Sequence, residues 1–229
     1  MDSISPERWN RLINFLGYGN PGGNYWFIGM EEGVHDEKNL FGELIKRADR
    51  FQEVEDVKKA HDLLGMNSTR PKTQTWTFMS RIVLAHQREQ GWQDPEMAKA
   101  YRNGRLGRVE GETFLTEVFP IPCKSRSQWP EGLPYALKSD YEREILPRRI
   151  KRLRELYERS RPKLVVCYGK SFWRHYESIF GGDGWKSLPG SKIKARTVNG
   201  RCVVLTPFLG NGQFSVDNAN TIADFAHQG

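Results

Sequence analysis

The sequence predicts an α/β protein: a three-layer αβα sandwich with a central, mainly parallel four-stranded sheet. Four short apolar runs typical of buried strands are spread along the 229 residues. Segments with helical periodicity separate these runs, and strands that alternate with helices favour a parallel sheet covered on both faces. Because no repeat, low-complexity tract or linker interrupts the pattern, we expect a single domain over residues 1–229.

Each predicted strand is an apolar run that lies between helical segments. These strands are Tyr25–Gly29, Thr113–Phe119, Leu164–Gly169 and Cys202–Thr206. The dipeptide Asn199-Gly200 predicts a type I′ turn that pairs Ile193–Val198 with the last strand as a hairpin.

The predicted helices show apolar residues at helical spacing. They are Glu7–Leu16, Glu53–Leu64, Thr75–Gln90, Pro95–Asn103, Asp140–Ser160, Lys170–Phe180 and Val216–His227. Gly17 ends the first helix, Asp140 is the expected N-cap of the fifth and Pro162 follows its end.

Charge and cysteine content narrow the class of protein. The net charge is +7, and between Asp183 and Asp217 every charged residue is basic. Such a stretch suits a surface that faces phosphates, although a solvated hairpin explains it equally well. The three cysteines, Cys123, Cys167 and Cys202, have no close spacing, so they fit neither a disulfide framework nor a metal site.

These features predict a cytoplasmic protein. The N-terminal residues lack the basic and apolar segments of a secretory signal, and no apolar run is long enough to cross a bilayer. We expect a monomer with no cofactor, no metal and no membrane partner.

Carboxylates follow the first two predicted strands, and ligands of open parallel sheets bind outside the carboxyl ends of strands. The first strand continues into Gly29-Met30-Glu31-Glu32-Gly33, where two glycines bracket two acids. Glu117 interrupts the apolar second strand, which ends before two prolines. Glu31 and Glu117 are therefore candidate site residues; the alternative is that both are solvated, at a turn and at an edge strand.

Two loops after the strands carry candidate DNA contacts. Lys124 and Arg126 lie in a loop rich in phosphate-binding side chains. The loop after the fourth strand, Thr206–Ser215, has no charge and carries Phe208 and Leu209. These apolar side chains either form a wedge that enters a base stack or fold back onto the core.

With these motifs, the chain resembles the uracil-DNA glycosylase superfamily, over most of its length in element order and in two short segments by motif. Gly29–Gly33 is similar to a first motif of the form Gly-Met-Asn-Pro-Gly, with Glu31 in the position of the catalytic Asn or Asp. Thr116-Glu117 before Pro120 looks like the base-reading strand. The loop Thr206–Ser215 falls at the last motif, but the expected histidine near Phe208 is missing.

The resemblance implies a glycosylase that flips a base out of DNA and hydrolyses its N-glycosidic bond. Glu31 would stabilise the sugar cation and orient the attacking water. The residues expected to recognise the base are Glu117, Gly33, Phe41 and Asn211. Those expected to bind DNA are Lys124, Arg126, Lys192, Arg196, Phe208 and Leu209.

Two of these residues suggest a substrate. Gly33 stands where the uracil-specific enzymes close the pocket with an aromatic, which leaves room for a larger base. An ionised Glu117 would accept a hydrogen bond from the amino group of cytosine. We therefore favour a bulky modified cytosine of phage DNA, which implies a defence role. The alternatives are a repair glycosylase for uracil or another deaminated base, and a non-catalytic DNA-binding protein, which the missing histidine favours.

Overall fold

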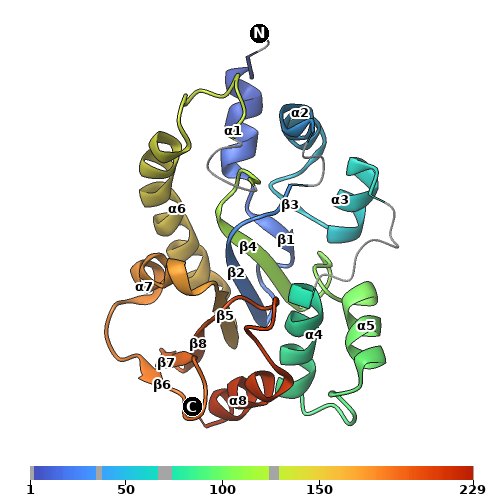
Figure 1. Cartoon of the computed structure of the whole chain (residues 1–229), viewed down its shortest axis with the longest axis vertical. Helices are drawn as coiled ribbons and strands as arrows, with labels where there is room; N and C mark the ends of the chain where they lie inside the picture. The colour runs from blue at the N-terminus through green and yellow to red at the C-terminus, as the bar shows by residue number, and fades with distance from the viewer. Residues whose placement is uncertain (1–2, 35–37, 67–73, 124–128, 229) are drawn as a thin grey trace.

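A mixed eight-stranded sheet runs through the centre of the molecule, in the order β3-β1-β4-β2-β5-β8-β7-β6 (Figure 1). The computed structural model describes residues 3–34, 38–66, 74–123 and 129–228. The strands are β1 (Gly17–Gly19), β2 (Tyr25–Glu31), β3 (Val54–Glu55), β4 (Thr113–Phe119), β5 (Leu164–Tyr168), β6 (Lys186–Ser187), β7 (Lys194–Val198) and β8 (Arg201–Thr206).

The four predicted strands form the parallel centre of this sheet, β4-β2-β5-β8. The prediction of only four strands is wrong, because β1 and β3 extend one side and β7 and β6 the other. The β1, β3 and β6 strands have two or three residues each, too few to show a period. Asn199 and Gly200 have φ of 52° and 74° between β7 and β8, which confirms the predicted turn.

Eight α-helices lie within the described ranges. They are α1 (Pro6–Asn14), α2 (Leu40–Arg50), α3 (Val57–Leu64), α4 (Gln74–His86), α5 (Pro95–Gly104), α6 (Lys138–Ser160), α7 (Trp173–Phe180) and α8 (Val216–Ala226), with a short 3-10 turn at Lys170–Phe172 before α7.

Most predicted helices are confirmed within a few residues, and two starts are wrong. The α6 helix begins at Lys138, so Asp140 lies inside its first turn rather than at its N-cap. The α3 helix begins only at Val57, because the Asp56 side chain accepts from two backbone N–H groups there. The α2 helix was not predicted.

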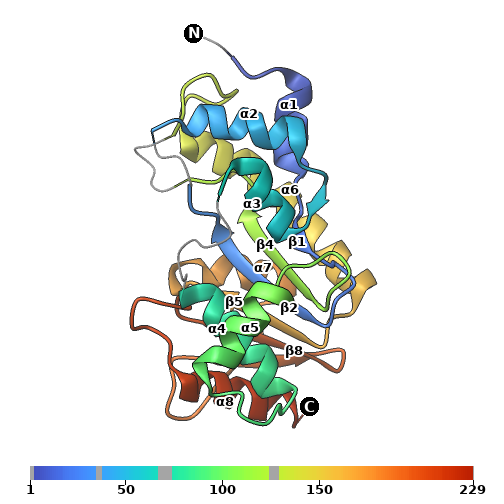
Figure 2. The same cartoon turned by 90° about the vertical axis from the view of Figure 1, so that its right-hand side faces the viewer.

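Helices cover both faces of the sheet, as predicted (Figures 1 and 2). Trp26 and Ile28 belong to a buried cluster that includes side chains of α1, α2, α6 and α7. Their neighbours Tyr25 and Phe27 belong to a second cluster, with side chains of α3, α4, α5 and α8. Successive strand residues point to opposite faces, so this alternation places one apolar layer on each side of the sheet.

The strand order also fixes where a ligand crevice is expected. The next central strand after β2 in the sequence, β4, lies on one side of β2, and the strand after that, β5, lies on its other side. Such a reversal leaves a crevice at the carboxyl ends of the two strands that flank it. Glu31 ends β2 and Tyr168 ends β5, so these residues border the crevice.

Within the described ranges, no helix is both long and apolar enough to cross a membrane.

Candidate active site

A hydrogen bond joins Glu117 and Tyr168 at the crevice. Glu117 on β4 is in register with Gly29 on β2, and β5 pairs with the other edge of β2. The Tyr168 hydroxyl donates to Glu117 Oε1 over 2.9 Å. A Cβ atom at position 29 would lie 2.1 Å from Glu117 Oε2 and 2.4 Å from the Tyr168 hydroxyl. Glycine at 29 is therefore what allows the two side chains to meet across the middle strand.

Gly29→Ala is expected to destabilise the protein by about 1–3 kcal/mol, because the added methyl group forces Glu117 and Tyr168 apart. Urea unfolding measures the change. Gly33→Ala is the matched control, since a Cβ at Gly33 meets no atom within 4 Å. Equal stability of the two variants would contradict the role assigned to Gly29.

The carboxyl group of Glu117 is buried and incompletely paired. Its Oε2 has no hydrogen-bond partner among the described residues. Burial raises the pKa of Glu117 to about 8, and the charges of Glu32 and Glu31 act in the same direction, against the Tyr168 hydrogen bond and the charge of Arg149. At pH 7 the neutral acid therefore predominates. The sequence-based assumption of an ionised, accept-only Glu117 is wrong, because the neutral acid also donates.

A small pocket of about 50 Å³ opens beside Glu117. Trp76, Met79 and Leu115 contribute apolar wall, and Glu32 and Tyr168 are among its polar groups. A mostly apolar wall with a few polar groups is the composition typical of ligand-binding pockets.

Glu32 belongs to this wall, but its oxygens are already occupied. Tyr18 donates to Oε2 over 2.7 Å, and Arg47 donates to both oxygens over 2.8 and 3.1 Å. Arg47 is itself buried and also pairs with the buried Glu43 at 2.8 Å. The network holds Glu32 in place and leaves it less available than a free carboxylate for proton transfer.

Glu31 lies at the end of β2, next to the pocket but not among its lining residues. Its Oε2 is 2.6 Å from Nζ of Lys138, the first residue of α6. Lys138 is only 5% exposed, so this ion pair fixes the Glu31 carboxylate at the crevice edge. Lys138 was missed by sequence reasoning because it lies 107 residues from Glu31 and in no motif.

Arg149 of α6 secures β4 below the pocket. Its buried guanidinium donates to the backbone oxygens of Phe15, Leu16 and Glu117 and to the Thr116 hydroxyl. Burial lowers the pKa of Arg149 to about 10, and the nearby Arg152 adds to this effect, yet the group remains charged at pH 7. These bonds tie the end of α1 and the start of β1 to the strand that carries Glu117.

The other residues predicted to recognise a base are dispersed. Gly33 is exposed, and a Cβ there would meet no atom within 4 Å. Phe41 is on α2 and packs half-buried against the core. Asn211 is exposed after β8, with its backbone N–H bonded to Gln74 Oε1 over 2.9 Å. Gly33, Phe41 and Asn211 are all outside the lining of the pocket beside Glu117.

The loop after β8 partly folds back onto the core. Leu209 is fully buried, so its prediction as a DNA contact is wrong for this conformation. Phe208 is only partly buried, and its ring meets the ring of Tyr168 edge-on, with 6.1 Å between centroids. Phe208 is thus the apolar side chain of this loop that reaches the site.

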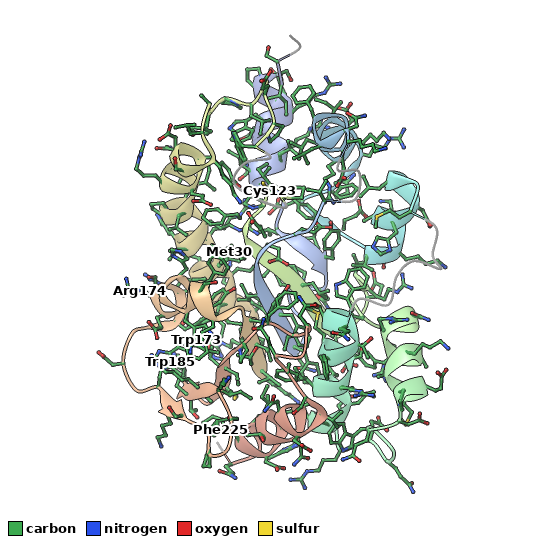
Figure 3. The ribbon with its side chains drawn as sticks, in the orientation of Figure 1. Met30, Cys123, Trp173, Arg174, Trp185 and Phe225 are labelled. Atoms are coloured by element: carbon green, nitrogen blue, oxygen red, sulfur yellow. The ribbon has the colours of Figure 1, made fainter. Side chains whose placement is uncertain are left out.

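Basic side chains lie over the rings of two tryptophans, Trp173 and Trp185, which Figure 3 labels. Lys170 and Lys194 lie 6.0 and 5.3 Å from the ring of Trp173. Lys194 is in register with Leu205, near the carboxyl end of β8. It therefore lies on the same side of the molecule as the carboxyl ends of β2 and β5, which border the crevice. The Trp173 indole N–H, in turn, donates to the Thr206 backbone oxygen that ends β8.

Of the four basic residues predicted to contact phosphates, the structure describes two, Lys192 and Arg196. Lys192 is exposed just before β7. Arg196 donates to the Gly181 backbone oxygen and lies over the ring of Trp185 at 5.6 Å. Lys124 and Arg126 lie outside the described residues.

No protein-family model matches this chain, and no curated protein matches it either. Among the described residues, no group of three or more His, Cys, Asp or Glu side chains is arranged to hold a metal ion. Cys123, Cys167 and Cys202 are all buried.

Proposed function

We propose that this protein is a DNA glycosylase that takes a flipped base into the pocket beside Glu117 and leaves an abasic site. The observation that carries the proposal is the buried Glu117 carboxyl group, with one oxygen unpartnered, beside the crevice that Glu31 borders. A buried polar atom without a partner is costly, so it is expected to meet a ligand atom.

The two acids have complementary roles in this mechanism. As the bond between C1′ and the base nitrogen breaks, positive charge develops on the sugar and the base leaves with the electron pair. The Glu31 carboxylate stabilises the sugar cation and accepts a proton from the water whose oxygen attacks C1′. The neutral Glu117 donates a hydrogen bond to an acceptor atom of the base and so stabilises the negative charge developing there.

The favoured substrate is a bulky modified cytosine of phage DNA, which gives the protein a defence role. The open space at Gly33 supports an enlarged base. The neutral Glu117 can donate to N3 or O2 of cytosine.

Uracil excision in repair is the second candidate function, and the neutral state of Glu117 favours it. A neutral acid can donate to a carbonyl oxygen of uracil, which an ionised carboxylate cannot. Glu117 alone therefore does not separate the two bases, and Gly33 is the residue that does.

In this proposal DNA is held by basic residues near the carboxyl ends of the strands, where the crevice also lies. Lys192 and the Lys170–Trp173–Lys194 group supply positive charge and an aromatic ring. Arg196, Lys124 and Arg126 remain proposed phosphate contacts, with Phe208 as the proposed wedge.

Purified protein is expected to form abasic sites in duplexes that carry glucosylated hydroxymethylcytosine. The test measures alkali-induced strand cleavage on matched duplexes with uracil, a thymine mismatch, cytosine, hydroxymethylcytosine or its glucosylated form. Gly33→Phe should abolish excision of the glucosylated base by filling the open space, and should leave excision of small bases unchanged.

Each alternative predicts a different result in the same assay. Excision of uracil alone, unaffected by Gly33→Phe, would make the protein a repair glycosylase. Intact DNA binding without abasic sites on any duplex would make it a non-catalytic DNA-binding protein.

A further inference from the structure

A second cavity lies at the amino ends of the central strands, opposite the carboxyl ends where the crevice lies. It is bordered by the residues at the starts of β5 and β8, the end of α4 and the end of α8, and has a volume of about 400 Å³. This volume falls in the range of about 300–1,000 Å³ typical of ligand pockets. Figure 3 shows one of its lining residues, Phe225, at the end of the molecule away from Met30, which precedes Glu31.

The lining of this cavity is strongly basic. It includes Arg161, Lys163 and Arg201, and the described lining residues include no carboxylate. Arg201 is partly neutralised, since it donates to Glu158 Oε2 over 3.0 Å. Arg161 and Lys163 are exposed and form no ion pair with another described residue. Two uncompensated cations thus remain for an anionic ligand.

Flat rings form another part of the wall. The imidazoles of His86 and His227 are stacked, with centroids 4.7 Å apart and planes 16° apart. His227 Nε2 donates to the His86 backbone oxygen over 2.9 Å, and the Tyr25 hydroxyl lies 3.0 Å from His86 Nδ1. Phe225 lines the same cavity. These contacts hold the rings in place before any ligand arrives.

The surroundings of His86 are positive as well. Burial lowers the pKa of His86, and the charges of His227, Lys163 and Arg88 lower it further. A neutral ring surrounded by cations is a sensitive reporter, because a bound anion would raise its pKa.

We infer that this cavity is a second ligand site, for a small compound that combines a phosphate group with a planar ring, such as a nucleoside monophosphate. Arg161 and Lys163 would pair with the phosphate, and Phe225 and the imidazoles would contact the ring. The site lies at the other end of the strands from Glu31 and Glu117, so it does not depend on the proposed glycosylase activity.

Titration of the full chain with AMP tests the inference. AMP is expected to bind with a Kd below about 1 mM, while inorganic phosphate and adenosine each bind at least about tenfold more weakly. Ring signals of His86 and His227 in NMR spectra should shift on addition of AMP. Lys163→Ala should weaken AMP binding roughly tenfold through loss of a charge-assisted hydrogen bond.

Lys58→Ala is the control, because this substitution removes the same charge as Lys163→Ala. Lys58 is exposed on α3 and does not line the cavity. Equal weakening by both variants would reduce the effect to general electrostatics and overturn the inference, as would absence of binding by calorimetry and NMR. Phosphate that binds as tightly as AMP would exclude a role for the ring. Equal affinity for a 5′-phosphorylated oligonucleotide would identify a strand end, not a free nucleotide, as the ligand.

Discussion

Glu31→Gln is expected to lower the rate of base excision by about 10²–10⁴-fold. The amide keeps the shape of the side chain but can neither accept a proton from water nor stabilise a sugar cation with a negative charge. Single-turnover formation of abasic sites measures the rate, and DNA binding measured by fluorescence anisotropy should be unchanged.

Glu32→Gln is the matched control for this experiment. Glu32 is the neighbouring acid and lies in the pocket wall, but Tyr18 and Arg47 occupy its oxygens. We expect the control to lose less than about tenfold in rate. If instead Glu32→Gln abolishes excision in a folded protein while Glu31→Gln remains active, the catalytic assignment moves to Glu32.

Excision by the wild type is expected to fall about tenfold per pH unit above pH 8, because only the neutral form of Glu117 donates to the base. Glu117→Gln replaces that acid with an amide, which keeps a donor and does not titrate. The variant should stay active and lose this pH dependence, whereas Glu117→Ala should be inactive. An inactive Glu117→Gln that still folds would show that the ionised form is required.

The same substitution has a predictable effect on stability. The folded pKa of Glu117, about 8, exceeds the ordinary value of 4.5, so the folded state binds more protons between these pH values. Its contribution to stability is therefore fully present below pH 4.5 and is lost as pH rises to about 8, by at most roughly 5 kcal/mol. Glu117→Gln should gain stability relative to the wild type between pH 5 and 9 in urea unfolding; parallel curves would contradict the buried, neutral acid.

The central sheet could be predicted from the sequence because its strands are buried on both faces. The runs that became β2, β4, β5 and β8 are apolar at successive positions, a signal each strand carries alone. The short outer strands β1 and β3 are defined by their partners, so no local pattern identifies them. Helix α2 did have a local signal, in the N-cap Asn39 and the spacing of Leu40, Leu44 and Ala48.

The residues of the candidate site likewise fall into those that a local sequence pattern identifies and those that only the tertiary structure identifies. Glu31 and Glu117 could be found from the sequence because each follows or interrupts a strand. Tyr168 and Lys138 could not, because their contacts depend on which strands and helices become neighbours. The protonation state of Glu117 likewise depends on burial by distant residues, and this is where the sequence-based interpretation failed.

Gly29 carries a constraint that its backbone angles do not reveal, since its φ lies outside the left-handed region. The space it leaves is used entirely by side chains of the two adjacent strands. Positions 29, 117 and 168 should therefore covary: a side chain at 29 becomes tolerable only when the residue at 117 or 168 shrinks. In a set of diverged sequences, an alanine at 29 that is compensated in this way would mark the chains that have given up the Glu117–Tyr168 pair, and with it the proposed chemistry.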